Sequence, residues 1–421
     1  MNIVELYELF KQYPSVQTDT RQLKPGDIFF ALKGPNFNAN AFAETALANG
    51  AAYAVIDDPA YGNRMNTILV EDVLTTLQQL ALYHRNQFNI PFLAITGSNG
   101  KTTTKELIHA VLSSTYTTYT TEGNLNNHIG IPLTLLKIKP DAQFAVIEMG
   151  ANHRGEIASY CVYTRPDHGL ITNIGKAHLE GFGGSEGVKL GKGELYEHIR
   201  SCRGTAFVMW DYEVLREISA SIENKFTYGT SGADVVGTLV TSEPFLRVKV
   251  LDTVIETQLV GAYNLPNVLA SVAVGRYFKV PDDKICKAIA EYVPVNSRSQ
   301  LVHAGSNKII LDAYNANPSS MKAAIENLEK LNHKKKFLVL GAMAELGDES
   351  LYEHQALADL IDRYNWSGVI LVGGDFMKIN TRYPVAATTA EAREWLKKQE
   401  VTDAYLLVKG SRGMKMETVV S

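Results

Sequence analysis

Three stretches of the chain share one pattern: a short apolar run ends in glycine or a polar residue, and helical sequence follows. The runs are FLAITG at 92–97, FAVIEMG at 144–150 and GLITNIG at 169–175. Continuous apolar runs of this length are typical of buried parallel strands, whose carboxyl ends carry functional residues. The pattern predicts a central domain with a mostly parallel sheet.

Shorter α/β patterns flank this region and predict two further domains. Before residue 88, strand-like runs at 27–32, 51–57 and 67–71 are interleaved with helical stretches at 40–50 and 73–88. After residue 300, βα units resume with apolar runs at 308–315, 336–343, 368–374 and 404–410. We expect a small N-terminal α/β domain, a central domain and a C-terminal Rossmann-like α/β domain, with bounds 1–88, 89–300 and 301–421. The first boundary falls at 89–91 because proline and the residue before it resist helix continuation.

The pattern changes between residues 205 and 261. The runs at 245–252 and 253–260 partly alternate between apolar and polar residues, which predicts antiparallel strands beside the main sheet. A helix is expected near 265–278, with Pro266 tolerated in its first turn.

Composition and charge exclude several classes of protein. The chain has 421 residues and a net charge of -4, which argues against nucleic acid as a partner because phosphate backbones require basic surfaces. No apolar run approaches the ~20 residues needed to span a bilayer. The start, MNIVELYELFKQY, predicts an amphipathic helix and not a signal peptide. The three cysteines are widely spaced and favour neither a disulfide framework nor a zinc site. We expect a cytoplasmic protein, and a monomer because no coiled-coil seam is present.

Residues 94–104 read AITGSNGKTTT and predict a phosphate-binding loop. A strand precedes the glycine-rich turn, and a helix follows in which Leu107, Ile108, Val111 and Leu112 share one face. In this context glycines let backbone N–H groups approach phosphates, the lysine adds a full charge and a threonine hydroxyl can bind Mg²⁺. The first glycine of the G-x-x-x-x-G-K-[ST] motif is replaced by Ile95, so an ordinary glycine turn is the alternative. The candidate nucleotide contacts are Gly97, Ser98, Asn99, Gly100, Lys101, Thr102 and Thr103.

Three further side chains are candidates for chemistry. Glu148 ends a predicted strand on the same sheet edge as the phosphate loop, where a carboxylate can hold Mg²⁺; the alternative is a solvent-exposed glutamate. His178 lies in the glycine-rich stretch NIGKAHLEGFGGSEG, and the alternative is a surface histidine. Lys192 is expected at the start of a helix, where its local sequence indicates only a solvated lysine.

Motifs along nearly the whole chain resemble the Mur ligase family, whose members form amide bonds with ATP in peptidoglycan synthesis. TDTRQLKPGDIFFALKG resembles the family's N-terminal uridine-nucleotide domain. Four stretches resemble the family's central ATPase domain: ITGSNGKTTTKE, TEGNLNNHIGIPLTLL, IEMGANHRGEI and ITNIGKAHLEGFGGSEGV. LDAYNANPSSM, LGAMAELG and LVKGSRGMKME resemble the C-terminal domain of the branch that adds a dipeptide. The resemblance implies transfer of D-alanyl-D-alanine to UDP-N-acetylmuramoyl-tripeptide in the cytoplasm.

The resemblance also implies roles for individual residues. Lys101 would contact the ATP phosphates, Thr102 and Glu148 would hold a first Mg²⁺, and His178 would help hold a second. Lys192 matches a family lysine that is carbamylated by CO₂, which replaces a cation with an anionic oxygen ligand. Asn264 and Asn267 match the adenine side, with helix capping as the alternative, and Arg298 and Asp312 match residues brought to the nucleotide. The implied substrate contacts are Thr18, Arg21, Asn124, Asn127, Tyr314, Asn315, Asn317, Lys409, Ser411 and Arg412.

One stretch departs from the family pattern. Where the branch often has an Asp-Gly-His-like sequence, this chain has Asn38-Ala39-Asn40, which removes a carboxylate and a glycine from the N-terminal domain. The sequence leaves both meso-diaminopimelate and L-lysine open as the third peptide residue.

The implied mechanism uses ATP to make a bond. The tripeptide carboxylate would attack the γ-phosphate to give an acyl phosphate, which the dipeptide amine would then convert to an amide. Domain closure would exclude water from that intermediate. Three alternatives stay open: a Mur-type ligase for another amino acid, a P-loop ATPase switch that drives motion, and a non-catalytic binding protein.

Overall fold

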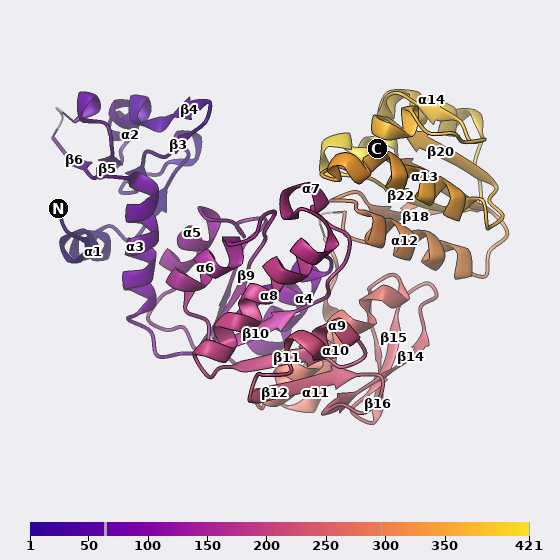
Figure 1. The fold of residues 1–421 in the computed structure, drawn as a ribbon, viewed down its shortest axis with the longest axis horizontal. Coiled ribbons are helices and arrows are strands. Elements are labelled where there is room, and N and C mark those ends of the chain that lie inside the picture. The colour runs from indigo at the N-terminus through magenta and orange to yellow at the C-terminus, as the bar shows by residue number, and fades with distance from the viewer. Residues whose placement is uncertain (63–64, 296, 421) are drawn as a thin grey trace.

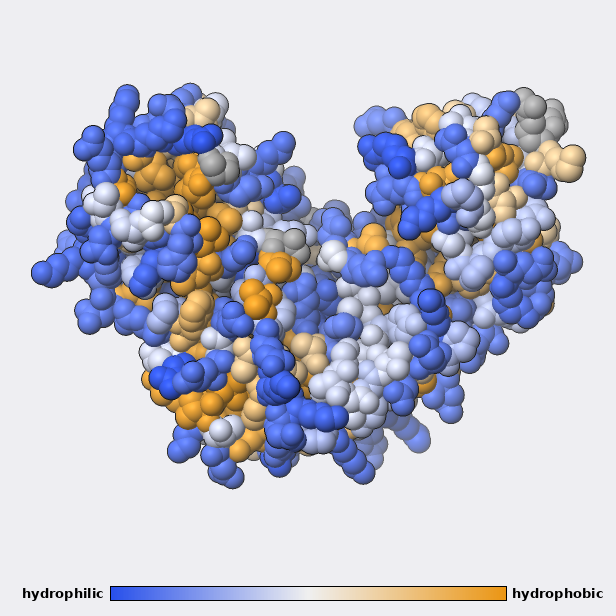
Figure 2. All heavy atoms as spheres, turned by 180° about the vertical axis from the view of Figure 1, so that it is seen from behind, coloured by the Kyte–Doolittle hydropathy of each residue, from blue (hydrophilic) through white to orange (hydrophobic). Residues whose placement is uncertain are grey.

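Three sheet-containing parts follow one another along the chain. The structure is a computed structural model that describes residues 1–62, 65–295 and 297–420. In Figure 1 the N-terminal and C-terminal parts rise from opposite sides of the central part. The space-filling view in Figure 2 shows the hollow that separates these two lobes. The expected three-domain α/β architecture is confirmed.

The N-terminal part is a four-stranded parallel sheet with helices packed on it. The strand order is β1-β2-β5-β6, with bounds Val16–Gln17, Ile28–Phe30, Tyr53–Ile56 and Thr67–Leu69. A small hairpin pairs β3 (Lys33–Gly34) with β4 (Phe37–Asn38). The helices are α1 (Ile3–Gln12), α2 (Ala43–Ala48) and α3 (Val73–Arg85). Helix α3 contacts α1 and also two helices of the central part, α5 (Gly130–Leu136) and α6 (Glu156–Thr164), so it joins the two parts.

The central part contains a seven-stranded, fully parallel sheet in the order β13-β12-β11-β10-β7-β9-β8. Its strands are β7 (Phe92–Thr96), β8 (Thr118–Thr120), β9 (Phe144–Glu148), β10 (His168–Ile171), β11 (Thr205–Met209), β12 (Asn224–Gly229) and β13 (Val235–Val236). All five residues of β7 and of β9 are buried. Burial on both faces explains why these strands are continuous apolar runs in the sequence.

Helices and a small second sheet complete the central part. The helices are α4 (Lys101–Ser113), α5 (Gly130–Leu136), α6 (Glu156–Thr164), α7 (Leu179–Phe182), α8 (Ser185–Ser201), α9 (Glu213–Ile218), α10 (Leu265–Tyr277) and α11 (Asp282–Glu291). Strands β14 (Thr238–Thr241), β15 (Arg247–Val250) and β16 (Thr253–Glu256) form an antiparallel sheet, as the runs at 245–260 predicted. The change of pattern expected from residue 205 begins later, because β11 and β12 still belong to the parallel sheet.

The C-terminal part has a six-stranded sheet in the order β17-β18-β22-β19-β20-β21. The strands are β17 (Gln300–Ala304), β18 (Asn307–Asp312), β19 (Lys336–Gly341), β20 (Gly368–Val372), β21 (Val385–Ala386) and β22 (Tyr405–Lys409). Only β17 is antiparallel to its neighbour, so the rest is the expected Rossmann-like arrangement. Its helices are α12 (Pro318–Lys330), α13 (Ser350–Ile361) and α14 (Thr389–Lys398). Within the described ranges of the whole chain, no helix has the length and apolar character that crossing a membrane requires.

Candidate active site

The phosphate loop connects β7 to α4, as the sequence predicted. Gly97 and Gly100 have φ values of 141° and 80°, a region that favours glycine. A Cβ on Gly97 would lie 2.0 Å from the Thr172 hydroxyl oxygen, and one on Gly100 would lie 2.7 Å from Asn267 Oδ1. Both positions therefore require glycine for conformation and for space. Lys101 folds back over the loop and donates from Nζ to the Gly97 carbonyl at 2.5 Å.

Glu148 is buried beside the phosphate loop, so the solvent-exposed alternative is wrong. It is 1% exposed because β9 is an inner strand of the sheet. The Thr102 hydroxyl donates to Glu148 Oε2 at 2.9 Å, and the Asn126 amide donates to Oε1 at 2.8 Å. The Thr121 hydroxyl accepts from the Glu148 backbone N–H at 2.9 Å. Sequence reasoning missed Asn126, although it stands between Asn124 and Asn127 in the same motif.

Lys192 is neither at a helix start nor solvated, and that expectation is wrong. Helix α8 begins at Ser185, so Lys192 lies in its interior and is 0% exposed. Its Nζ donates to the Ala151 carbonyl at 2.8 Å and lies 4.8 Å from the centre of the Phe182 ring. A Cβ on Gly191 would lie 2.4 Å from a Phe182 ring carbon, so the glycine admits the ring that covers the lysine.

Burial gives the two lysines of the site unusual electrostatics. The pKa of Lys192 lies well below its ordinary value, first because of burial and then because of the Lys101 charge, with smaller opposing effects from Glu156 and Glu194. Burial also lowers the pKa of Lys101, and Glu148 partly offsets that effect. A buried amine with a lowered pKa has more of its neutral, nucleophilic form.

His178 lies where the central and C-terminal parts meet. Its backbone is left-handed, with a φ of 55°, and its Nδ1 lies against the carboxylate of Glu345 from the C-terminal part. This contact lowers the pKa of the Glu345 carboxyl. The surface-histidine alternative is wrong, because only 18% of the side chain is exposed. Sequence reasoning did not select Glu345, although it lies in the LGAMAELG motif.

Asn264 and Asn267 connect α10 to the phosphate-loop helix. Asn264 occupies the N-cap position of α10, but its side chain makes no capping hydrogen bond. Its amide donates to the Val260 carbonyl at 2.9 Å, and the Asn267 amide donates to Asn264 Oδ1 at 2.8 Å. The Thr104 hydroxyl donates to Asn267 Oδ1 at 3.0 Å. The capping alternative is therefore wrong, and both side chains remain in the wall of the cleft.

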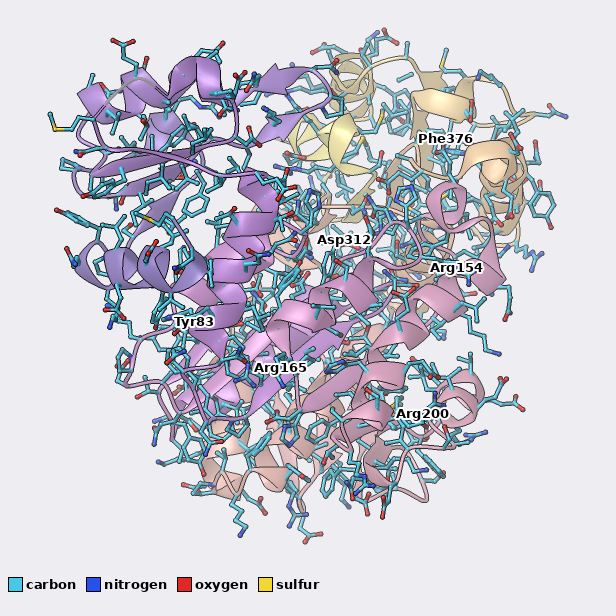
Figure 3. The ribbon with its side chains drawn as sticks, turned by 60° about the vertical axis from the view of Figure 1, so that its left-hand side comes forward. Tyr83, Arg154, Arg165, Arg200, Asp312 and Phe376 are labelled. Carbon is cyan, nitrogen blue, oxygen red and sulfur yellow. The ribbon has the colours of Figure 1, made fainter. Side chains whose placement is uncertain are left out.

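The C-terminal part and the segment just before it, which carries Arg298, contribute a cluster of charged and aromatic side chains. The Arg298 guanidinium lies 3.5 Å from the centre of the Tyr314 ring, and that of Arg412 lies at 5.8 Å. Lys409 is only 2% exposed, and its Nζ donates to Asp312 Oδ2 at 2.6 Å. Figure 3 shows Asp312 near the middle of the molecule. The Asp312 carboxylate is therefore already paired with a buried cation.

A cleft of about 1100 Å³ brings most of the predicted residues together. It is lined by Ser98, Asn99, Gly100, Lys101, Thr102, Thr103, Asn124, Asn127, Glu148, His178, Asn264, Asn267, Arg298, Asp312, Tyr314, Asn315, Asn317, Lys409, Ser411 and Arg412. Gly97 and Lys192 lie outside the lining, and so do Thr18 and Arg21 of the N-terminal part. Arg21 instead pairs with Asp19 at 2.7 Å, with 87% of its side chain exposed.

The departure at Asn38-Ala39-Asn40 has a structural explanation. Asn40 is fully buried, and its amide donates to Asp57 Oδ1 at 2.8 Å while its Oδ1 accepts from the Asp57 backbone at 3.0 Å. Lys33 pairs with the same carboxylate at 2.7 Å. In this chain the N-terminal stretch is thus fixed by amides around Asp57.

The fold and the cleft define a class of protein: a three-domain α/β enzyme with a phosphate loop at the edge of its central parallel sheet. Residues 95–275 match the Mur ligase middle domain, and residues 297–412 match the family described as Mur ligase, glutamate ligase domain. The chain belongs to the Mur ligase family.

Full-length relatives give a finer comparison. The chain is 35% identical to the UDP-N-acetylmuramoyl-tripeptide–D-alanyl-D-alanine ligase of Bacillus subtilis (strain 168), with 96% of this chain and 92% of the relative covered. The ligase of the same name from Escherichia coli (strain K12) gives the same three values. Among solved structures, MurF from Acinetobacter baumannii is 32% identical, with a TM-score of 0.88 over 96% of this chain and 92% of that one. MurF ligase from Thermotoga maritima in complex with ADP is 28% identical, with a TM-score of 0.86 and 96% of both chains covered.

Proposed function

We infer that this protein uses ATP to join D-alanyl-D-alanine to UDP-N-acetylmuramoyl-tripeptide, as a ligase of peptidoglycan precursor synthesis. The observation that carries this conclusion is the single cleft in which the phosphate loop and buried Glu148 face residues of the C-terminal part. Relatives that carry the name of this ligase align with it over nearly their full length. The products are ADP, phosphate and an amide.

The residues of the cleft account for the two steps of the reaction. The tripeptide carboxylate attacks the γ-phosphorus of ATP, ADP leaves and an acyl phosphate forms. The dipeptide amine then attacks the acyl carbon, loses a proton, and displaces phosphate. Lys101 and the N–H groups at the start of α4 face the charge that builds on the phosphate oxygens during the first step. The walls contributed by the C-terminal part keep water from the acyl phosphate.

The residues around Glu148 fit a Mg²⁺ ion. The Thr102 hydroxyl and the Glu148 carboxylate are adjacent oxygen donors, the ligand type that Mg²⁺ prefers. Such an ion would neutralise charge between the nucleotide phosphates. Among the residues that the structure describes, no three His, Cys, Asp or Glu side chains are grouped to bind a metal unaided. A second Mg²⁺ at His178 therefore requires a further anionic ligand.

Carbamylated Lys192 is our candidate for that ligand. The unmodified amine is buried. Among the described residues, the Ala151 carbonyl is the one group that accepts its hydrogen bond. Because burial lowers its pKa, the amine has a neutral form that can attack CO₂. The carbamate would supply anionic oxygen next to a metal site, where an ammonium ion would be repelled.

The remaining roles belong to the same proposal. We assign Asn264, Asn267, Arg298 and Asp312 to the nucleotide, and Asn124 and Asn127 to the tripeptide end. The side of the cleft that would receive the dipeptide consists of Tyr314, Asn315, Lys409, Ser411 and Arg412. The uridine nucleotide would be contacted by Thr18 and Arg21. The domains 1–88, 89–300 and 301–421 would bind the uridine nucleotide, bind ATP and close the site, respectively. We propose a cytoplasmic monomer.

Phosphate release by the purified protein tests this function. The assay supplies MgATP with D-alanyl-D-alanine and, in turn, the UDP-muramoyl-tripeptide with diaminopimelate or with L-lysine. We expect release only when both substrates are present, together with a product whose mass shows the new amide. The tripeptide that supports turnover identifies the third residue. Release from ATP alone, unchanged by either substrate, would refute the ligase and favour an ATPase switch.

A further inference from the structure

The first turn of α12, in the C-terminal part, lies directly on the phosphate loop. Asn317 is the N-cap of this helix, and its Oδ1 accepts from the Ser320 backbone N–H at 2.9 Å. The same side chain donates from Nδ2 to Asn99 Oδ1 at 2.8 Å. Asn317 is 8% exposed, so this hydrogen bond is largely shielded from water. The single amide group of Asn317 therefore caps helix α12 and also binds the phosphate loop of the central part.

The backbone of Asn99 is held by the segment that follows β10. Its N–H donates to Asn173 Oδ1 at 3.0 Å, and its carbonyl accepts from the Asn173 amide at 3.1 Å. The Thr172 hydroxyl donates to the same carbonyl at 2.6 Å. Asn99 immediately precedes Gly100, which leads into Lys101 and helix α4, so it stands within the turn that we assign to the phosphates.

We propose that Asn317 is a positioning residue that acts through Asn99. When the C-terminal part docks, the Asn317 amide fixes the Asn99 side chain and completes the phosphate loop around ATP. Phosphoryl transfer thereby requires docking. The reactive acyl phosphate therefore does not form while the cleft is open. This inference rests on the proposed use of ATP at this site, and it gives Asn317 a role other than contact with a substrate.

Asparagine suits this position for a chemical reason. The position needs an acceptor for the helix N-terminus and a donor for the loop, on one short side chain. Serine can cap the helix but is too short to reach Asn99 as well. Aspartate can also cap it, but it would present a carboxylate oxygen to Oδ1 of the Asn99 side chain. These two substitutions separate helix capping from contact with the loop.

Another contact joins the same two parts without touching the phosphate loop. Lys176 Nζ donates to Glu353 Oε1 at 2.5 Å, between the segment after β10 and helix α13. Glu353→Gln weakens docking but leaves Asn99 and Asn317 in place. It is the matched control for a general loss of docking.

The test is a double-mutant cycle on the full chain, with the dissociation constant for ADP, kcat, KM for ATP and Tm as readouts. We expect Asn317→Ser to keep the wild-type Tm and to weaken ADP binding about three- to tenfold, the loss of one net hydrogen bond. In an Asn99→Ala background the same substitution should have no further effect, because its partner is gone. Glu353→Gln should retain its full effect in that background. Asn317→Asp should keep Tm and lose more ADP affinity than Asn317→Ser.

The outcomes separate this inference from the proposed function. Additive effects of Asn317→Ser and Asn99→Ala, or unchanged ADP binding by Asn317→Ser, would overturn the positioning role while leaving the ligase intact. A loss of Tm that is equal in the serine and aspartate variants would also overturn it, because it would show a structural role alone. A wild-type protein that binds no ADP would refute the nucleotide site and this inference together.

Discussion

Gly97→Ala is the substitution whose cost the structure defines best. Gly97 has a φ of 141°, and non-glycine residues in such strained regions cost roughly 1–3 kcal/mol. The added Cβ would lie 2.0 Å from the Thr172 hydroxyl oxygen and 3.0 Å from the Thr172 backbone nitrogen. The hydroxyl can rotate away only by giving up its hydrogen bond to the Asn99 carbonyl, at about 1 kcal/mol. The backbone nitrogen cannot rotate, so the loop itself must move.

These contributions together predict a loss of about 2–4 kcal/mol in the free energy of unfolding of the central part. For a domain of this size, each kcal/mol lowers Tm by about 2–4 °C, so we expect a decrease of roughly 5–15 °C. Because the loop must move, we also expect ADP to bind at least about tenfold more weakly, which corresponds to about 1.4 kcal/mol. Scanning calorimetry and titration calorimetry measure the two effects.

Gly193→Ala is the matched control. Gly193 lies inside helix α8, and a Cβ there would meet no atom within 4 Å. Alanine in a helix interior is more stable than glycine by about 0.5–1 kcal/mol, so this variant should gain stability and bind ADP normally. If Gly97→Ala kept the wild-type Tm and ADP affinity, the conclusion that the loop requires glycine at this position would be refuted.

Three further predictions concern buried charges. Lys192→Met should abolish turnover without lowering Tm. Because burial lowers the native pKa of the unmodified Lys192 amine, the unfolded chain binds more protons than the native protein between that lowered pKa and about pH 10.4. Wild-type stability should therefore rise with pH within that window, and the variant's pH curve, from calorimetric scans, should be flatter. Glu148→Gln keeps an acceptor for Thr102 but loses the charge, so phosphate release should fall by at least about a hundredfold and more Mg²⁺ should be needed, as a magnesium titration would show. Lys409→Met leaves Asp312 as an unpaired charge and should lower the free energy of unfolding by about 3–5 kcal/mol. Adding Asp312→Asn should recover part of that loss. Equal chemical-denaturation midpoints for the single and double variants would contradict this pairing.

Local sequence was sufficient where a pattern depends on neighbouring residues. The strand, glycine turn and helix at 92–113 were predicted because strand burial, glycine conformation and helix periodicity all act within a few residues. The same reasoning found the antiparallel strands at 245–260, where the side chains of β15 alternate between an exposed and a buried face. It did not find β14, the first strand of that sheet, and it set the change of pattern at residue 205 although β11 and β12 still pair in the parallel sheet.

Lys192 shows what local sequence could not reveal. It stands between two glycines, Gly191 and Gly193, and this local sequence indicates only a solvated lysine. In the fold, Phe182 covers the amine and the Ala151 carbonyl accepts its hydrogen bond, although these residues are 10 and 41 positions away. The lowered pKa that makes carbamylation chemically reasonable therefore comes from packing between segments. Only the resemblance to a family had singled this lysine out.

By itself, the sequence determined the class of fold, the phosphate loop and the family motifs, because these depend on residue types at short, fixed spacings. The tertiary structure alone decided which side chains meet. It buried Glu148 against Thr102, paired His178 with Glu345 and set Asn317 against Asn99, more than 200 residues apart in the chain. Contacts of that kind follow from how sheets and domains dock, and no short-range pattern specifies them. Burial in turn sets the electrostatics of the lysines, since the pKa of an amine depends on how much water surrounds it in the folded protein.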